Sequence, residues 1–124
     1  MSDKGIGWSS LHVAIVVTLG MVLISGVLLL LPPGVDVVSV SNDKMGHVLA
    51  FTALVFPLAV VRPSWAMAIW FSAVAYGGLI EVIQPLAGRA AELADLDADA
   101  LGAALGVCIG AAIGHWRNRR LRSA

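Results

Sequence analysis

Residues 77–106 of the chain read GGLIEVIQPLAGRAAELADLDADALGAALG. The stretch begins inside an apolar run, and Glu81 stands where a hydrophobic residue would be expected. Gln84 follows on the same face of a helix. Pro85 and Gly88 then predict the end of that helix. Several acidic residues precede a second apolar run, so this stretch places most of the unusual polar chemistry of the chain between two long apolar segments.

The composition of the whole chain points to a membrane protein. Of its 124 residues, 59% are hydrophobic and only 13% are charged, whereas a soluble domain usually has about 25% charged residues. The 8 basic and 8 acidic residues cancel, so the charge gives no argument for nucleic acid as a partner. Cys108 is the only cysteine, which excludes an intrachain disulfide. The length suits a single domain over residues 1–124.

Four apolar segments are long enough to span a membrane, because about 20 apolar residues cross the hydrocarbon core. We predict helices at residues 11–31, 44–61, 64–84 and 96–116. The connections between them are short, so neighbouring helices should be antiparallel. The sequence therefore predicts an all-α fold, a four-helix transmembrane bundle with short loops.

The first apolar segment has an alternative interpretation as a cleaved signal peptide. The apolar part of a signal peptide is about 7–15 residues long and precedes a cleavage site with small residues. Residues 11–31 form a longer run, and Pro32 and Pro33 follow it. We therefore predict that this segment is retained as a membrane-spanning helix.

The basic residues predict how the bundle is oriented. Most of them fall on one side of the predicted membrane: Lys4, Arg62, Arg117, Arg119, Arg120 and Arg122. Only Lys44 and Arg89 fall on the other side, so the positive-inside rule places both termini in the cytoplasm. The predicted cytoplasmic edge also receives Trp8, Trp65 and Trp116, as expected of an aromatic belt. The terminal arginines are expected to contact anionic membrane lipids.

This orientation brings polar residues from three segments to the outer end of the bundle. The candidate ligand-binding residues are Asp43, Lys44, His47, Glu81, Gln84, Arg89, Asp95 and Asp99. Hydropathy alone does not require such a convergence. We therefore predict that these side chains line one cavity that opens to the outer surface. The candidates for catalysis among them are His47, Glu81 and Asp99.

Glu81 is predicted to lie about one turn inside the end of its helix. A carboxylate at that depth is costly, and such residues usually face the interior of a bundle and find a partner there. Gly77 and Gly78, one turn earlier, would let a neighbouring backbone approach closely. Glu81 is therefore either part of a structural pair with Lys44 or Arg89, or part of a polar site.

His47 shares a predicted helix face with Asp43 and Lys44. A single histidine on an apolar face is commonly a hydrogen-bonded packing residue. An imidazole beside carboxylates also suits general acid–base chemistry or metal binding. A metal site built from His47, Glu81 and Asp95 would match no standard motif, so we predict no metal ion and no cofactor.

Acidic residues open the fourth predicted helix. Asp95 and Asp97 suit its first turn, where exposed N–H groups and the helix dipole favour carboxylates. Asp99 lies further in, in line with a stripe of small residues that would let membrane helices pack tightly. The stripe consists of Gly102, Ala103, Gly106, Gly110 and Gly114. Asp99 should therefore point into the bundle, towards Glu81 and His47.

Several of these residues form an ordered pattern. It reads Asp43-Lys44-x-x-His47-x-x-x-Phe51, Glu81-x-x-Gln84, Gly88-Arg89, Asp95 and Gly102-x-x-x-Gly106. This pattern lies between Asn42 and Gly110 and resembles the VanZ-like family of small bacterial membrane proteins. Asp99 departs from the family pattern, which usually has asparagine there, and it adds a charge to the proposed site.

The resemblance implies a role at the cell envelope, in the cytoplasmic membrane of a bacterium. The family is named for a member associated with resistance to teicoplanin, a lipoglycopeptide antibiotic. The implied ligands are therefore a lipid-linked envelope precursor, a peptidoglycan-related molecule or a lipoglycopeptide. The resemblance supplies no reaction, because a fold does not fix a function.

Three functions stay open at this point. The protein is a binding module for an envelope ligand, a hydrolase or transferase acting on a phosphorylated lipid, or a purely structural membrane subunit. In the enzyme, His47 or Glu81 would act as general base and Arg89 would hold a phosphate. An isosteric change such as Glu81→Gln would abolish an enzyme's activity, whereas a binding module would tolerate it in part. Membrane lipids are expected partners, and a homo-oligomer is compatible with all three functions.

Overall fold

The computed structural model of the protein describes residues 7–32 and 43–124. They form four long helices, α1 (Trp8–Leu30), α2 (Asp43–Val61), α3 (Ala66–Ile83) and α4 (Leu93–Ser123). Two short 3₁₀ helices, η1 (Pro63–Trp65) and η2 (Gln84–Ala87), flank α3. No strand occurs in these two described ranges, and each long helix is apolar and long enough to cross a membrane. The prediction of an all-α fold with four membrane-spanning helices is therefore confirmed.

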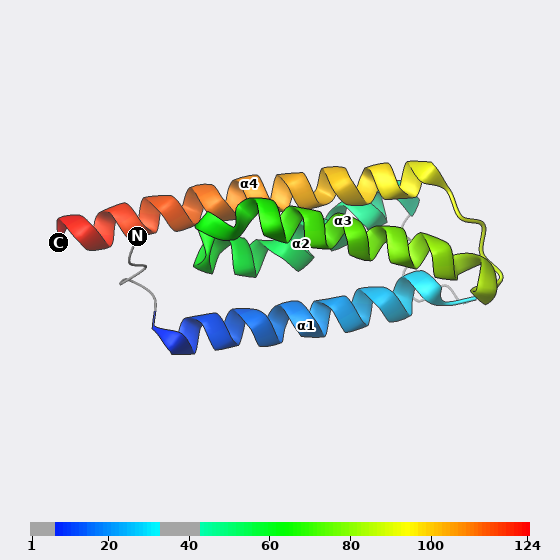
Figure 1. The fold of residues 1–124 in the computed structure, drawn as a ribbon, viewed down its shortest axis with the longest axis horizontal. Helices are drawn as coiled ribbons and strands as arrows, with labels where there is room; N and C mark the ends of the chain where they lie inside the picture. The colour runs from blue at the N-terminus through cyan, green and yellow to red at the C-terminus, as the bar shows by residue number, and fades with distance from the viewer. Residues whose placement is uncertain (1–6, 33–42) are drawn as a thin grey trace.

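The long helices run side by side, and each is antiparallel to the next one in the chain (Figure 1). One end of the bundle, here called the terminal end, holds the start of α1, the turn between α2 and α3, and the end of α4. The opposite end, here called the loop end, holds the connection between α3 and α4. Figure 1 also shows α1 set apart from the other three helices. Which end faces the cytoplasm stays a prediction.

The end of α3 follows the local sequence signals. Pro85 lies at the start of η2, where its missing N–H is tolerated. Gly88 then takes a left-handed conformation with φ of 77°, which only glycine adopts without strain. The chain turns at this point and leaves the helix, close to the predicted end at residue 84.

The fourth helix is longer than the predicted span of residues 96–116. It begins at Leu93 and continues to Ser123, beyond the apolar run. The reason is that arginine is a good helix former and needs no burial. The hydropathy of a sequence marks where a helix crosses the membrane, but it does not mark where the helix stops.

α2 and α4 pack more extensively than any other pair of elements. A Cβ atom at Gly102 would overlap the carbonyl oxygen of Val48, and one at Gly106 would lie 2.5 Å from the carbonyl oxygen of Thr52. The Thr52 hydroxyl also donates to the carbonyls of Val48 and Gly102, at 2.7 and 2.9 Å. The prediction that the stripe of small residues packs closely against a neighbouring helix is therefore confirmed.

The main apolar core lies between α2, α3 and α4. Its buried residues are Phe51, Leu54, Val55, Ala59, Ile69, Ala73, Ala103 and Val107. A smaller cluster of Leu11, Ala14 and Val61 joins α1 to α2 near the terminal end. Much of the remaining surface of α1 is aliphatic and exposed, which suits contact with lipid.

Hydrogen bonds fasten α1 towards the loop end. The Tyr76 hydroxyl donates to the Val22 carbonyl at 2.6 Å and lies 3.1 Å from the Ser25 hydroxyl. Arg89 donates to the Leu31 carbonyl at 3.3 Å. Carbonyl groups at the end of a helix have no partner within that helix. Arg89 therefore satisfies a group that an apolar membrane would leave unpaired.

Candidate functional site

A histidine–aspartate pair lies at the centre of the candidate site. His47 comes from the second turn of α2, and Asp99 comes from the second turn of α4. Nδ1 of His47 lies 2.7 Å from Oδ1 of Asp99, and both residues are 0% exposed. The close approach of the two helices at Gly102, one turn further along, brings the pair together. A carboxylate at this distance fixes the orientation of the imidazole ring.

Gly77 on α3 makes room for the carboxylate of Asp99. A Cβ atom at Gly77 would lie 2.6 Å from Oδ2 of Asp99, so a larger residue would displace this side chain. At Gly78, no described atom lies within 4 Å of the Cβ position. The prediction that both glycines admit a neighbouring backbone is therefore wrong, because Gly77 admits a side chain and Gly78 faces open space.

Two more carboxylates approach the pair. Oδ2 of Asp95, one turn before Asp99, lies 3.8 Å from Nε2 of His47. Glu81, in the last turn of α3, accepts a hydrogen bond at 2.9 Å from the backbone N–H of Glu92. Glu92 immediately precedes α4, so this bond ties the end of α3 to the start of α4, where the helix dipole favours a negative charge.

Gln84 lies beside Glu81 and is 1% exposed. In one orientation its amide nitrogen donates to the Leu29 carbonyl at 3.3 Å. When the amide is turned over, the nitrogen donates to both carboxylate oxygens of Glu81, at 3.2 and 3.3 Å. The second orientation is the better one, because a buried carboxylate needs donors. Gln84 therefore helps to hold Glu81 in place.

These side chains form what we call the buried polar cluster. Its members are His47, Glu81, Gln84, Asp95 and Asp99, and none is more than 9% exposed. Three carboxylates surround one imidazole and one amide, so the interior of the cluster attracts hydrogen-bond donors and cations and repels anions. Burying such charges is costly unless each one is paired or hydrogen-bonded.

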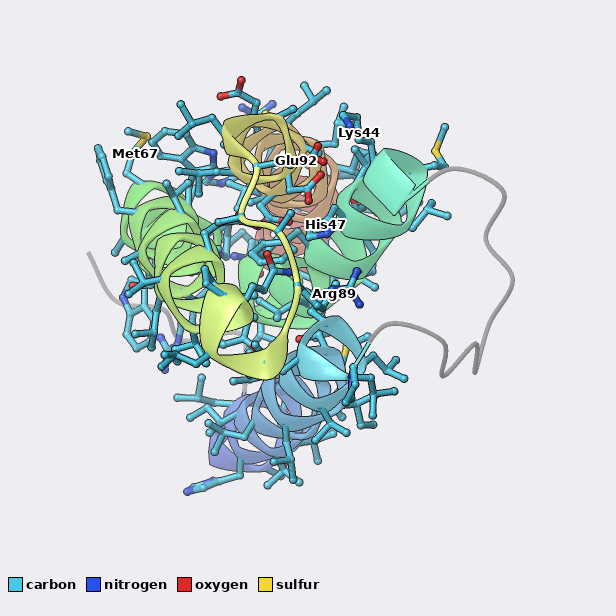
Figure 2. All side chains as sticks on the ribbon, turned by 90° about the vertical axis from the view of Figure 1, so that its right-hand side faces the viewer. Lys44, His47, Met67, Arg89 and Glu92 are labelled. Carbon is cyan, nitrogen blue, oxygen red and sulfur yellow. The ribbon has the colours of Figure 1, made fainter. Side chains whose placement is uncertain are left out.

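Two basic residues lie at the rim of the cluster. Nζ of Lys44 is 3.4 Å from Oε2 of Glu92, and both side chains are about half exposed. Figure 2 looks at the loop end and shows Lys44 and Glu92 close together near His47, with Arg89 nearer to α1. Lys44 therefore pairs with Glu92, whereas one sequence alternative paired it with Glu81.

Two further acidic residues lie near the starts of helices. Asp43 is the first residue of α2, and its side chain lies outside the described part of the chain. Asp97 is exposed on α4, as expected of a carboxylate near the start of a helix. The start of α4 thus holds both a buried acid, Asp95, and an exposed one, Asp97.

Glu92 is a site residue that the sequence interpretation did not include. Its backbone N–H binds Glu81, and its carboxylate binds Lys44. The available signal was its position at the start of the last apolar run, where a helix has free N–H groups. That signal marks Glu92 as a helix-start residue but does not reveal which carboxylate its N–H will meet.

The buried polar cluster is closed in this structure. His47, Gln84 and Asp99 are at most 1% exposed, so the prediction that they line a cavity open to the outer surface is wrong. α4 packs tightly against α2 at Gly102, one turn from Asp99, and so helps to bury the pair of His47 and Asp99. In the described ranges, no group of three or more His, Cys, Asp or Glu side chains is placed to hold a metal ion.

Comparison with protein-family models, with curated proteins and with solved structures found no match. The resemblance to the VanZ-like family therefore depends on the sequence pattern alone. The four apolar helices are compatible with a multi-pass integral membrane protein.

Proposed function

We propose that the chain is a VanZ-like integral membrane protein of the bacterial cell envelope, in the cytoplasmic membrane with both termini in the cytoplasm. Its buried polar cluster acts at the outer face on a lipid-linked or peptidoglycan-related ligand, and it changes susceptibility to teicoplanin-type antibiotics. The observation that carries this proposal is the fully buried pair of His47 and Asp99 with two further carboxylates beside it. Ionisable residues inside a membrane bundle are costly and usually serve a function.

Stability alone gives a weak reason for such a cluster. Replacing a buried ion pair by apolar residues of similar size is often neutral or stabilising. The α2–α4 interface already packs closely along its stripe of glycines without any charge. A bundle that needed only to fold would do as well with apolar residues at positions 47 and 99.

The charge distribution defines the chemistry of the ligand. The acidic interior favours a group that donates hydrogen bonds or carries a positive charge, such as a sugar hydroxyl or a peptide amine. A phosphate would be repelled from the interior and would bind at the rim, where Lys44 and Arg89 offer donors. The exposed Lys44–Glu92 pair at this rim opens at little cost, because exposed ion pairs are weak.

One observation favours the enzyme as a second candidate. A buried carboxylate that holds Nδ1 of a histidine is the arrangement that orients an imidazole for general acid–base catalysis through Nε2. His47 and Asp99 have this arrangement. In a hydrolase or transferase acting on a phosphorylated lipid, His47 would exchange a proton with the substrate, and Asp99 would position the ring.

The experiment expresses the chain in a teicoplanin-susceptible bacterium and measures the inhibitory concentration of the drug. The unmodified chain should change it relative to an empty vector. Glu81→Gln should weaken the change in a binding module and remove it in an enzyme, because the amide has lost the carboxylate's charge and one of its acceptors. Asp97→Asn is the matched control, because Asp97 is an exposed carboxylate near the cluster. Asp99→Asn should retain the effect, because an amide oxygen still accepts a hydrogen bond from His47 and asparagine is usual in the VanZ-like pattern.

Membrane accumulation of each variant is measured in parallel. Weakening or loss of the effect with normal accumulation of Glu81→Gln supports a functional cluster. If Glu81→Gln lowers its membrane accumulation and its effect on the inhibitory concentration in the same proportion, the cluster is a structural element and the proposal is contradicted. An unmodified chain that leaves the inhibitory concentration unchanged would contradict the proposed role in antibiotic susceptibility.

A further inference from the structure

A second feature of the bundle lies away from the buried polar cluster. α1, α2 and α3 line a half-open apolar cavity of about 240 Å³. Thr18 and Val22 line it from α1, Leu54 and Leu58 from α2, and Ser72 from α3.

The cavity lies between two places where α1 is attached to the bundle. Near the terminal end, Leu11 and Ala14 pack against Val61. Towards the loop end, the Tyr76 hydroxyl donates to the Val22 carbonyl. α1 packs on α2 more extensively than on α3, and Figure 1 shows α1 as the helix set apart from the other three.

Aromatic packing separates the cavity from the buried polar cluster. Phe51 is one turn beyond His47 on α2 and is 0% exposed. Its ring centroid lies 5.8 Å from that of Tyr76, whose side chain lines the cavity at the end nearer the cluster. A ligand in the cavity therefore contacts apolar side chains and does not reach His47, so the two features are independent.

The terminal end of the cavity carries a positive charge. Trp65 lines the cavity there and is 46% exposed, and the guanidinium of Arg62 lies 5.5 Å from the centre of its ring. In the described ranges, every Lys, Arg, Asp or Glu near this end is basic. These residues are Arg62, Arg117, Arg119, Arg120 and Arg122.

We propose that this cavity binds one acyl chain of an anionic phospholipid, taken from the membrane leaflet at the terminal end. The apolar walls match a hydrocarbon chain, and Ser72 and Ala68 both line the cavity and are exposed, so it opens towards the surrounding lipid. Arg62 beside Trp65 matches a negatively charged headgroup. This site does not depend on the function proposed for the cluster.

The test measures which lipids stay bound to the purified protein. The full chain is reconstituted into vesicles of equal parts phosphatidylglycerol and phosphatidylcholine, extracted, washed with detergent and examined by native mass spectrometry. Ser72→Phe fills the cavity from α3 and should lower retained phosphatidylglycerol by about tenfold or more. Ala75→Phe is the matched control, because Ala75 is exposed on the same helix and does not line the cavity.

The headgroup is tested separately. Arg62→Gln should reduce the preference for phosphatidylglycerol over phosphatidylcholine by about fivefold, since a basic residue near an anionic surface contributes about 1 kcal/mol. Arg119→Gln is its control, because Arg119 is exposed at the same end on α4, whereas Arg62 is the arginine that contacts Trp65 at the cavity. An equal effect of both substitutions would show general attraction to the surface and would overturn the assignment of the headgroup to this site.

Two results would overturn the proposal for the chain site. One is an unmodified protein that retains no phospholipid after the wash. The other is equal retention by the unmodified protein, Ser72→Phe and Ala75→Phe, which would mean that the bound lipid lies elsewhere. If Ser72→Phe does not accumulate, Ala68→Phe fills the cavity from the preceding turn of the same helix face and is judged by the same criterion.

Discussion

The contact of α4 with α2 and the contact of α1 with the rest of the bundle differ in almost every physical respect. At Gly102, α4 lies so close to α2 that a Cβ atom would overlap its backbone, whereas α1 leaves a cavity of about 240 Å³. The first contact encloses the buried pair of His47 and Asp99. The second is held by an apolar cluster and by hydrogen bonds from Tyr76 to a carbonyl of α1 and from Arg89 to the carbonyl of Leu31, just after it.

The difference shows how a small bundle combines a fixed polar cluster with an apolar surface on α1 that has room for a ligand. A buried polar group has to be partnered at short range, and only tight packing keeps its partners in place. An apolar ligand needs space and no directed bonds, so it suits the loosely attached helix. The substitutions below test this division, from the largest expected effect to the smallest.

Gly106→Leu should have the largest effect, because its side chain would collide with the backbone of Thr52 and with Val55 on α2. The loss of stability should exceed the roughly 1–3 kcal/mol typical of overpacking, since a backbone cannot move aside as a side chain can. Leu105→Ala is the control, because Leu105 is 44% exposed on the same helix. Equal membrane accumulation of the two variants would contradict the close packing of α4 on α2.

His47→Ala should come next, because it leaves the buried Asp99 carboxylate without its imidazole partner. Removing one member of a buried pair typically costs about 3–5 kcal/mol. Leu49→Ala, at a position that is 60% exposed on the same helix, should cost much less. Thermal unfolding in detergent measures the stability of both variants. Equal melting temperatures of the two variants would contradict the buried pair.

Tyr76→Phe should have a smaller effect that is confined to α1. The change removes the hydroxyl that donates to Val22 and lies beside Ser25. A single hydrogen bond contributes about 0.5–1.5 kcal/mol. Hydrogen exchange of the amides in α1 should become faster, while that of α4 serves as an internal control. Unchanged exchange in α1 would show that Tyr76 does not fasten this helix.

Lys44→Ala should have the smallest effect on stability. Its pair with Glu92 is exposed, and such pairs contribute less than about 1 kcal/mol. Added salt should shrink the difference from the unmodified protein further. A loss of stability as large as that of His47→Ala would place Lys44 within the core of the cluster and would contradict its position at the rim.

The helices were predictable because hydropathy, proline and glycine each leave a local signal. The four apolar runs locate the membrane spans, and Gly88 marks the turn that ends α3. The inward direction of Asp99 was also predictable, because the helical period places it in line with the glycines of α4. The extension of α4 to Ser123 was missed, because an arginine-rich helix outside the apolar run has no hydropathy signal.

The internal contacts of the site could not be predicted in the same way. The bond from the Glu92 N–H to Glu81 depends on the path of the connection between α3 and α4, and the side chain of Glu92 does not encode what its backbone will bind. Gly77 shows the same limit, since a small residue signals that something comes close without saying whether it is a backbone or the carboxylate of Asp99. These contacts depend on the three-dimensional packing of separate segments.

The position of the buried polar cluster relative to the membrane is the most direct point to measure. Reporter fusions placed after Ala124 and inserted at Ala91 distinguish the two orientations of the bundle. We predict a cytoplasmic signal from the fusion at Ala124 and an exported signal from the fusion at Ala91, because the basic residues gather at the terminal end. An exported signal from the fusion at Ala124 would place the cluster on the cytoplasmic side and would contradict its proposed action on an envelope ligand.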